Sequence, residues 1–66
     1  MITDKELLKI LREACEKAGS QRKWAVDNGF SPAYVNDVLQ GKRYISEAMA
    51  KKLGYEPNKK RWVLKK

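Results

Sequence analysis

The stretch that decides the fold is residues 21–41, which read QRKWAVDNGFSPAYVNDVLQG. Ser20, immediately before it, is a favourable N-cap because its hydroxyl can accept a hydrogen bond from a free backbone N–H of the first helical turn. Asn28 followed by Gly29 is a turn signal. A short helix over residues 21–28 is therefore expected, with Asn28 as its C-terminal cap.

A second helix start follows almost at once. Ser31 is again an N-cap residue, and Pro32 occupies the first helical position, where its missing N–H costs nothing. This helix is expected over residues 32–40 and ends at Gly41. Because only residues 29–31 separate the two helices, the sequence predicts a tight helix-turn-helix.

Two further helices are expected on either side of this pair. Thr3 and Glu6 fit a capping box that begins a helix over residues 4–18. Ser46 caps another helix over residues 47–53. The first helix carries an apolar stripe at spacings of three and four: Leu7, Leu8, Leu11, Ala14, Cys15 and Ala18. The predicted fold class is all-α, a small four-helix bundle containing the helix-turn-helix, which allows for a short C-terminal β-strand.

That strand is expected over residues 61–65, RWVLK, which place Trp62 and Leu64 on one face if extended. A single strand needs a partner to be stable, and a second copy of the chain could supply it. In the alternative interpretation, Trp62 folds back onto the helix over residues 4–18.

Composition limits the class of protein. The 66 residues allow one domain. The formal charge is +7, from 15 Lys and Arg against 8 Asp and Glu, which favours a polyanion as partner. Five positive charges fall in residues 59–66, either as phosphate contacts or as a solvated tail. The absence of His and the single Cys exclude a zinc set and the common nucleophilic triads, so neither an enzyme, a cofactor nor a metal is expected.

The location of the protein can also be predicted. The longest apolar run, residues 62–64, is far shorter than the roughly 20 residues that span a bilayer, and the first residues lack a signal-peptide core. We therefore expect a cytoplasmic protein. In that compartment Cys15 stays reduced, and its place in the apolar stripe indicates a buried thiol.

The helix over residues 32–40 presents two different faces. Val35, Val38 and Leu39 face inward. The outward positions follow at i, i+3, i+4 and i+7: Ala33, Asn36, Asp37 and Gln40. A solvated helix face usually carries Lys and Glu, whereas these short and amide side chains suit an approach to base edges in the major groove, which is about 12 Å wide.

The spacing Q-x3-A-x3-G-x5-V-x2-V-x2-G over residues 21–41 resembles the helix-turn-helix of the phage repressor and Cro family. The resemblance extends over about residues 4–55. It implies a domain at residues 1–58 that binds DNA, with the helix over residues 32–40 in the major groove and two-fold dimers on inverted repeats. Residues 59–66 would form a basic segment that contributes a dimerisation strand.

The resemblance also implies site residues. The base-reading positions would be Ser31, Ala33, Asn36, Asp37 and Gln40. Their chemistry suggests that Asn36 and Gln40 each bind adenine N6 and N7, that Ala33 meets a thymine methyl, and that Asp37 accepts from cytosine N4. The phosphate contacts would be Gln21, Arg22, Tyr34, Lys42, Arg43 and Tyr44. For Tyr34, packing beneath the turn is an equally good alternative to a phosphate contact. The dimer would form through Trp62 and Leu64.

The leading functional hypothesis is a dimeric, sequence-specific transcriptional regulator of phage or prophage type. Its partners would be double-stranded DNA and a second copy of the chain, with no membrane and no small-molecule ligand. When bound to DNA, the protein would be nucleoid-associated. One alternative is a phage DNA-packaging or recombination accessory protein. Another is a protein-interaction module, such as an antitoxin, that uses the outward face of residues 32–40.

Overall fold

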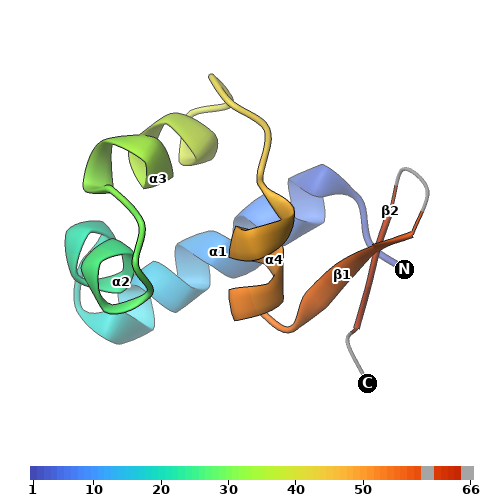
Figure 1. Cartoon of the computed structure of the whole chain (residues 1–66), viewed down its shortest axis with the longest axis horizontal. Coiled ribbons are helices and arrows are strands. Elements are labelled where there is room, and N and C mark those ends of the chain that lie inside the picture. The colour runs from blue at the N-terminus through green and yellow to red at the C-terminus, as the bar shows by residue number, and fades with distance from the viewer. Residues whose placement is uncertain (59–60, 65–66) are drawn as a thin grey trace.

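In the part of the chain that the structure describes, four helices are followed by two antiparallel strands (Figure 1). The computed structural model describes residues 1–58 and 61–64. The elements are α1 (Asp4–Ala18), α2 (Gln21–Asp27), α3 (Pro32–Leu39), α4 (Glu47–Lys52), β1 (Tyr55–Asn58) and β2 (Arg61–Leu64). In Figure 1, α2 and α3 lie at one end of the molecule and the hairpin lies at the other, with α1 running between the two ends.

The expectation of an all-α four-helix bundle is wrong. The chain contains an antiparallel sheet of β1 and β2, and α4 packs mainly on β1 instead of completing a bundle. A strand was expected only at residues 61–65, and its partner proves to be Tyr55–Asn58 of the same chain. The expected boundary between residues 58 and 59 falls between the two strands of this hairpin.

The sequence did not predict β1 because it contains Pro57, and a proline inside a short segment argues against a strand. In the structure Pro57 lies opposite Trp62. The N–H and C=O of Trp62 both bond to Ile2, on the other side of β2, over 2.9 and 2.8 Å. Because these two groups of one residue point to the same edge of a strand, the Pro57–Trp62 pair needs no hydrogen bond between its members. Proline therefore fits at this register position of an edge strand.

Trp62 joins the hairpin to α1. Its side chain is buried, and its Nε1–H donates to Asp4 Oδ1 in the first turn of α1 over 2.5 Å. The N-terminal residues thus pair with β2 through Ile2 and anchor its indole through Asp4. The interpretation in which Trp62 folds back onto the first helix agrees with this placement.

The core lies where α1, the helix pair, α4 and β2 meet. The capping box at Thr3 and Glu6 starts α1 as expected, and the apolar stripe faces inward from there. Every helix contributes side chains. The buried residues are Leu7, Leu11, Cys15, Trp24, Ala25, Val35, Val38, Ile45, Met49, Ala50 and Trp62. The predicted inward positions of α3 are confirmed for Val35 and Val38.

The turn between α2 and α3 is closed by a complete Schellman motif. Phe30 N–H donates to Ala25 O over 2.8 Å, and Gly29 N–H donates to Val26 O over 3.2 Å. Asn28 is the C-cap, as the sequence predicts, and its side-chain Nδ2 donates to Trp24 O. Phe30 then stacks on Trp24, with ring centroids 5.8 Å apart and an interplanar angle of 9°.

We predict that Gly29→Ala lowers the free energy of unfolding by about 1 to 2 kcal/mol, because Gly29 has φ +81° and an L residue is disfavoured in this left-handed region. An added Cβ would meet no atom within 4 Å, so the loss reports backbone conformation alone. Gly29→Asn, which tolerates that conformation better, should lose less. Urea denaturation measures both, and equal losses for the two variants would contradict the explanation.

Candidate nucleic-acid interface

The helix α3 is fixed at both ends by caps. Ser31 Oγ accepts a hydrogen bond from Tyr34 N–H over 3.0 Å at the N-terminus. At the C-terminus, Gly41 N–H donates to Val38 O and Lys42 N–H donates to Asp37 O over 3.1 and 2.9 Å. These bonds fix the position of the loop after α3 relative to the helix.

The outward face of α3 forms where the sequence predicts it. Ala33 and Gln40 are exposed, and Asn36 and Asp37 are partly exposed. Ser31, just before the helix, is also exposed, and its O–H is free to donate while the oxygen caps the helix. All five expected base-reading residues therefore lie on or beside one face of α3.

Two of these residues belong to a cluster of amides. Asn36 Oδ1 accepts hydrogen bonds from Gln21 Nε2 over 3.2 Å and from Gln40 Nε2 over 3.3 Å. Gln21 begins α2, so the cluster joins the two helices of the motif. In this arrangement, Asn36 Nδ2 remains to donate and Gln40 Oε1 remains to accept. Asn36 alone does not offer the free donor and acceptor of a bidentate contact to adenine, because its oxygen already accepts two hydrogen bonds, whereas Gln40 keeps Oε1 and one Nε2–H.

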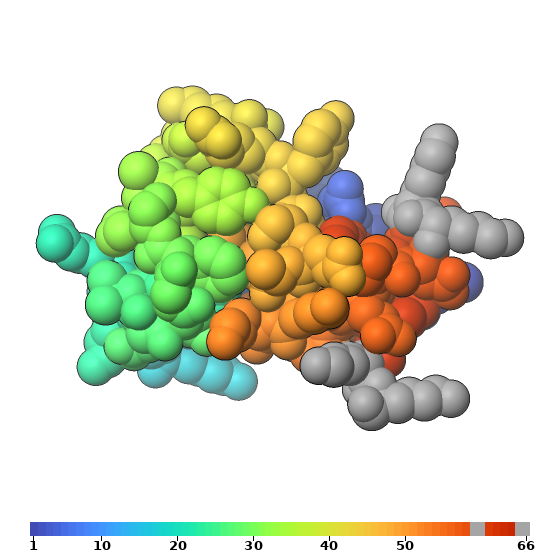
Figure 2. All heavy atoms as spheres, viewed as in Figure 1, coloured from blue at the N-terminus to red at the C-terminus, as the bar shows by residue number. Residues whose placement is uncertain are grey.

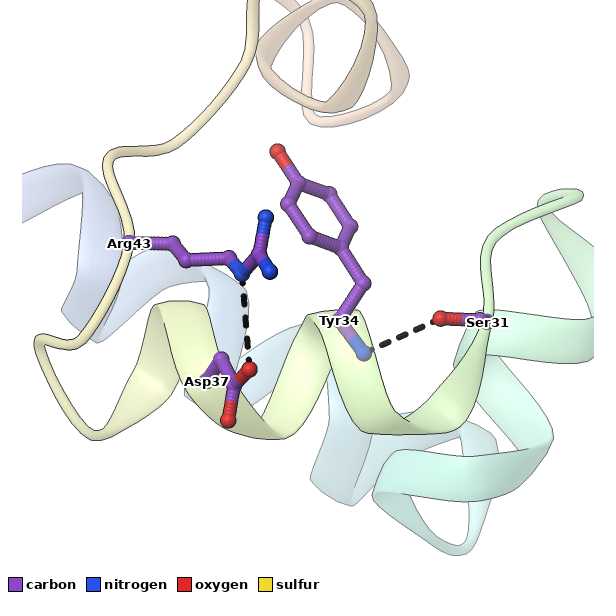
Figure 3. A network of polar contacts seen from close by, with 4 residues as sticks. All are labelled: Ser31, Tyr34, Asp37 and Arg43. Carbon is purple, nitrogen blue, oxygen red and sulfur yellow. Dashed lines mark hydrogen bonds and ion pairs between the residues drawn. The ribbon is translucent and has the colours of Figure 1, made fainter.

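Asp37 is paired within the chain. Arg43 Nε lies 3.4 Å from Asp37 Oδ2, and Figure 3 shows the Arg43 side chain reaching back from the loop over α3, on the same side as Tyr34. The family resemblance implies a base contact for Asp37 and a phosphate contact for Arg43, each as an independent residue. In the structure, these two side chains contact each other.

Basic and aromatic side chains border the face. Lys42, Arg43 and Tyr44 follow α3 and are exposed, with Tyr44 at 90%. In Figure 2, the loop that carries them, in yellow, projects from the surface beside α3. Arg22, in the first turn of α2, is also exposed. Positive charge therefore flanks a face whose own helix contains no Lys or Arg.

Tyr34 packs in the protein. It lies against the core, and its ring centroid is 6.3 Å from that of Phe30. Of the two interpretations of this residue, packing beneath the turn is the one that matches its position, while a phosphate contact by its hydroxyl stays a prediction.

Arg12 is a neighbour of the amide cluster that the sequence did not indicate. A hollow of about 400 Å³ lies between α1 and α3, and Arg12, Gln21, Asn36 and Gln40 are among its lining residues. Because the exposed positions of α1 carry charges of both signs, the charge pattern of this helix does not set Arg12 apart. It is the packing of α1 beside α3 that places Arg12 next to the amide cluster.

The two expected dimerisation residues lie in different environments. Trp62 is 8% exposed and belongs to the core of its own chain, whereas Leu64 is 69% exposed. Of the basic C-terminal side chains, Arg61 is exposed. Lys59, Lys60, Lys65 and Lys66 lie outside the described residues.

Other kinds of site find little support in the described part of the chain. Residues 1–58 and 61–64 contain no group of three or more His, Cys, Asp or Glu arranged to hold a metal ion. No helix there is both long and apolar enough to cross a bilayer. Cys15 is buried, and this desolvation raises the pKa of its thiol, which disfavours the reactive thiolate.

Comparison with known proteins adds no relative: no family model, curated protein or solved structure matches the chain. The functional interpretation therefore depends on the residues and geometry described above.

We predict that the amide cluster is energetically coupled. Gln21→Ala and Asn36→Ala should each lower the free energy of unfolding by about 0.5 to 1.5 kcal/mol through the loss of partly buried hydrogen bonds. Because both variants remove the same bond, the double variant should lose measurably less than the sum of the two. Additive losses in a thermal or urea double-mutant cycle would show that the two amides act independently.

Proposed function

We propose that this protein is a sequence-specific DNA-binding transcriptional regulator that inserts α3 into the major groove and binds an inverted-repeat operator as a dimer. The observation that supports this most strongly is the outward face of α3. It presents short and amide side chains from a capped helix, and Arg22, Lys42 and Arg43 border it. In this arrangement, the short and amide side chains suit contacts with base edges, and the bordering basic side chains suit contacts with phosphates.

The dimensions of the helix suit the groove. An α-helix with its side chains is about 10 to 12 Å in diameter, which matches the width of the major groove, about 12 Å. Ala33 is small and exposed, so it leaves room for the first half of the helix to approach the bases. A long Lys or Glu at this position would hold the backbone away from the groove floor.

The amide cluster suggests how one base is selected. Asn36 Nδ2 and Gln40 Oε1 together offer a donor and an acceptor, while Gln21 holds Asn36 from the opposite side. Adenine presents the complementary pair in the major groove, N7 as acceptor and the N6 amino group as donor. The cluster therefore supports recognition of one adenine jointly by Asn36 and Gln40, since the oxygen of Asn36 is already engaged and is not free to accept from N6.

The dimer belongs to the proposal because one short helix contacts only a few base pairs, too few for selectivity. Two copies related by a two-fold axis would contact half-sites about one helical turn apart. Leu64 is the expected dimerisation residue that remains exposed for such a contact.

Selection of bound duplexes from a randomised DNA pool tests the proposal. The selection is run at near-physiological salt with nonspecific competitor, and the bound DNA is sequenced. We expect an enriched inverted repeat with half-site centres about 10 base pairs apart. An absence of enrichment, with binding that disappears as salt rises, would mean that the +7 charge alone attracts DNA, and the interpretation as a protein-interaction module would then take precedence.

Gln40→Ala and Lys42→Ala form a matched pair, since Gln40 is the C-cap of α3 and Lys42 lies two residues further along the chain. Gln40→Ala should cost about 1 to 3 kcal/mol on the selected duplex and relax the preference at one base pair. Lys42→Ala should weaken binding to all duplexes alike and reduce the slope of log K against log salt by about 1. Fluorescence anisotropy on selected and scrambled duplexes measures both, and an equal loss on the two duplexes for Gln40→Ala would remove it from the base-reading set.

Leu64→Glu tests the dimer without disturbing the core. Since Leu64 is 69% exposed, the free energy of unfolding should change by no more than about 0.5 kcal/mol. Sedimentation should shift toward the monomer, and affinity for the inverted repeat should fall together with the mass. An unchanged mass would show that Leu64 lies outside the dimer contact. Trp62→Ala is unsuitable for this purpose because it removes a core side chain.

A further inference from the structure

The ion pair between Asp37 and Arg43 joins two kinds of expected DNA contact. Asp37 is on the outward face of α3 and Arg43 is in the bordering loop, with Nε and Oδ2 3.4 Å apart (Figure 3). Asp37 also fixes the loop through its backbone, since its C=O accepts a hydrogen bond from Lys42 N–H over 2.9 Å. The pairing is therefore built into the way α3 ends.

This pair is suited to exchange its partners. The side chain of Arg43 is 64% exposed and that of Asp37 is 33% exposed, so water screens their attraction and little stability depends on it. The atom of the guanidinium that approaches Asp37 is Nε, and its two Nη groups carry four further N–H donors that a phosphate can engage. Arginine binds phosphate through two parallel N–H donors, and such a contact is stronger than a single exposed ion pair.

An unpaired carboxylate in the major groove is unfavourable because the phosphates on both sides repel it. Two partners on this chain or on DNA can compensate Asp37: Arg43, or the N4 amino group of a cytosine. If a cytosine binds Asp37, Arg43 is free to move to a phosphate. Guanine and thymine present acceptors to a carboxylate, and at adenine the N7 acceptor beside the N6 amino group repels it, so Arg43 stays with Asp37 at these three bases.

We infer that the Asp37–Arg43 pair is a specificity device that releases Arg43 to the DNA backbone only where a cytosine takes its place on Asp37. This inference rests on the proposed function and names a further determinant of its selectivity. Its consequence is that the correct sequence gains one phosphate contact that incorrect sequences lack. Because each phosphate contact adds about 0.9 to the slope of log K against log salt, the two complexes differ in salt dependence as well as in affinity.

The experiment measures binding of the full chain to the selected duplex and to duplexes in which each base pair of the half-site is replaced in turn, over a range of salt concentrations. For the unaltered protein, replacement of one G·C pair should cost about tenfold in affinity and reduce the slope by about 0.9. For Asp37→Ala, affinity for scrambled DNA should rise, that G·C pair should lose most of its effect, and the slopes should become equal.

Glu47→Ala is the matched control. It also removes one negative charge from an exposed ion pair, between Glu47 and Lys51 in α4, with Nζ and Oε1 3.2 Å apart. It should raise affinity for all duplexes slightly and retain both the G·C preference and the difference in slope. Circular dichroism confirms that both variants fold.

The inference is overturned if Asp37→Ala and Glu47→Ala behave alike, or if the unaltered protein shows one slope on all duplexes while still preferring a sequence. If the unaltered protein prefers no duplex at all, the proposed function itself fails and the inference fails with it. The two failures are therefore told apart by the unaltered protein alone.

Discussion

The turn between α2 and α3 is the constraint on which the candidate interface depends. Two backbone hydrogen bonds, from Phe30 to Ala25 and from Gly29 to Val26, end α2 and reverse the chain within three residues. The stack of Phe30 on Trp24 then ties the turn to the core. Since Gln21 lies at the start of α2 and Asn36 in α3, their hydrogen bond forms only if this turn holds the two helices at their observed separation.

Local sequence predicts the helices well because their caps are local. A serine precedes α2, α3 and α4, and each accepts a hydrogen bond from the N–H three residues ahead, as its position suggests. The hairpin could not be predicted in the same way. Its pairing depends on Ile2 and Trp62, which are far apart in the sequence. It also depends on a register in which Pro57 lies opposite Trp62 at a position that requires no N–H donor.

In the candidate site, too, local features could be predicted from the sequence and contacts between distant residues could not. Helical periodicity predicts which residues of α3 point outward, and the partly exposed amides and Asp37 lie where it places them. It does not predict that Asn36 accepts from both Gln21 and Gln40, or that Asp37 pairs with Arg43. The Gln40–Asn36 bond is an i,i+4 contact along α3, whereas the Gln21–Asn36 bond arises from the crossing of α2 with α3 and the Asp37–Arg43 pair from the path of the loop after α3. Together they turn the expected single-residue contacts into cooperating sets.

The groove entered by α3 is the most direct test of the central claim. Partial methylation of the selected duplex with dimethyl sulfate modifies guanine N7 in the major groove and adenine N3 in the minor groove, and bound and free fractions are then compared by sequencing. The proposed insertion of α3 predicts that N7 methylation within each half-site prevents binding while N3 methylation there does not. Interference confined to adenine N3, or absent from the half-sites, would contradict it.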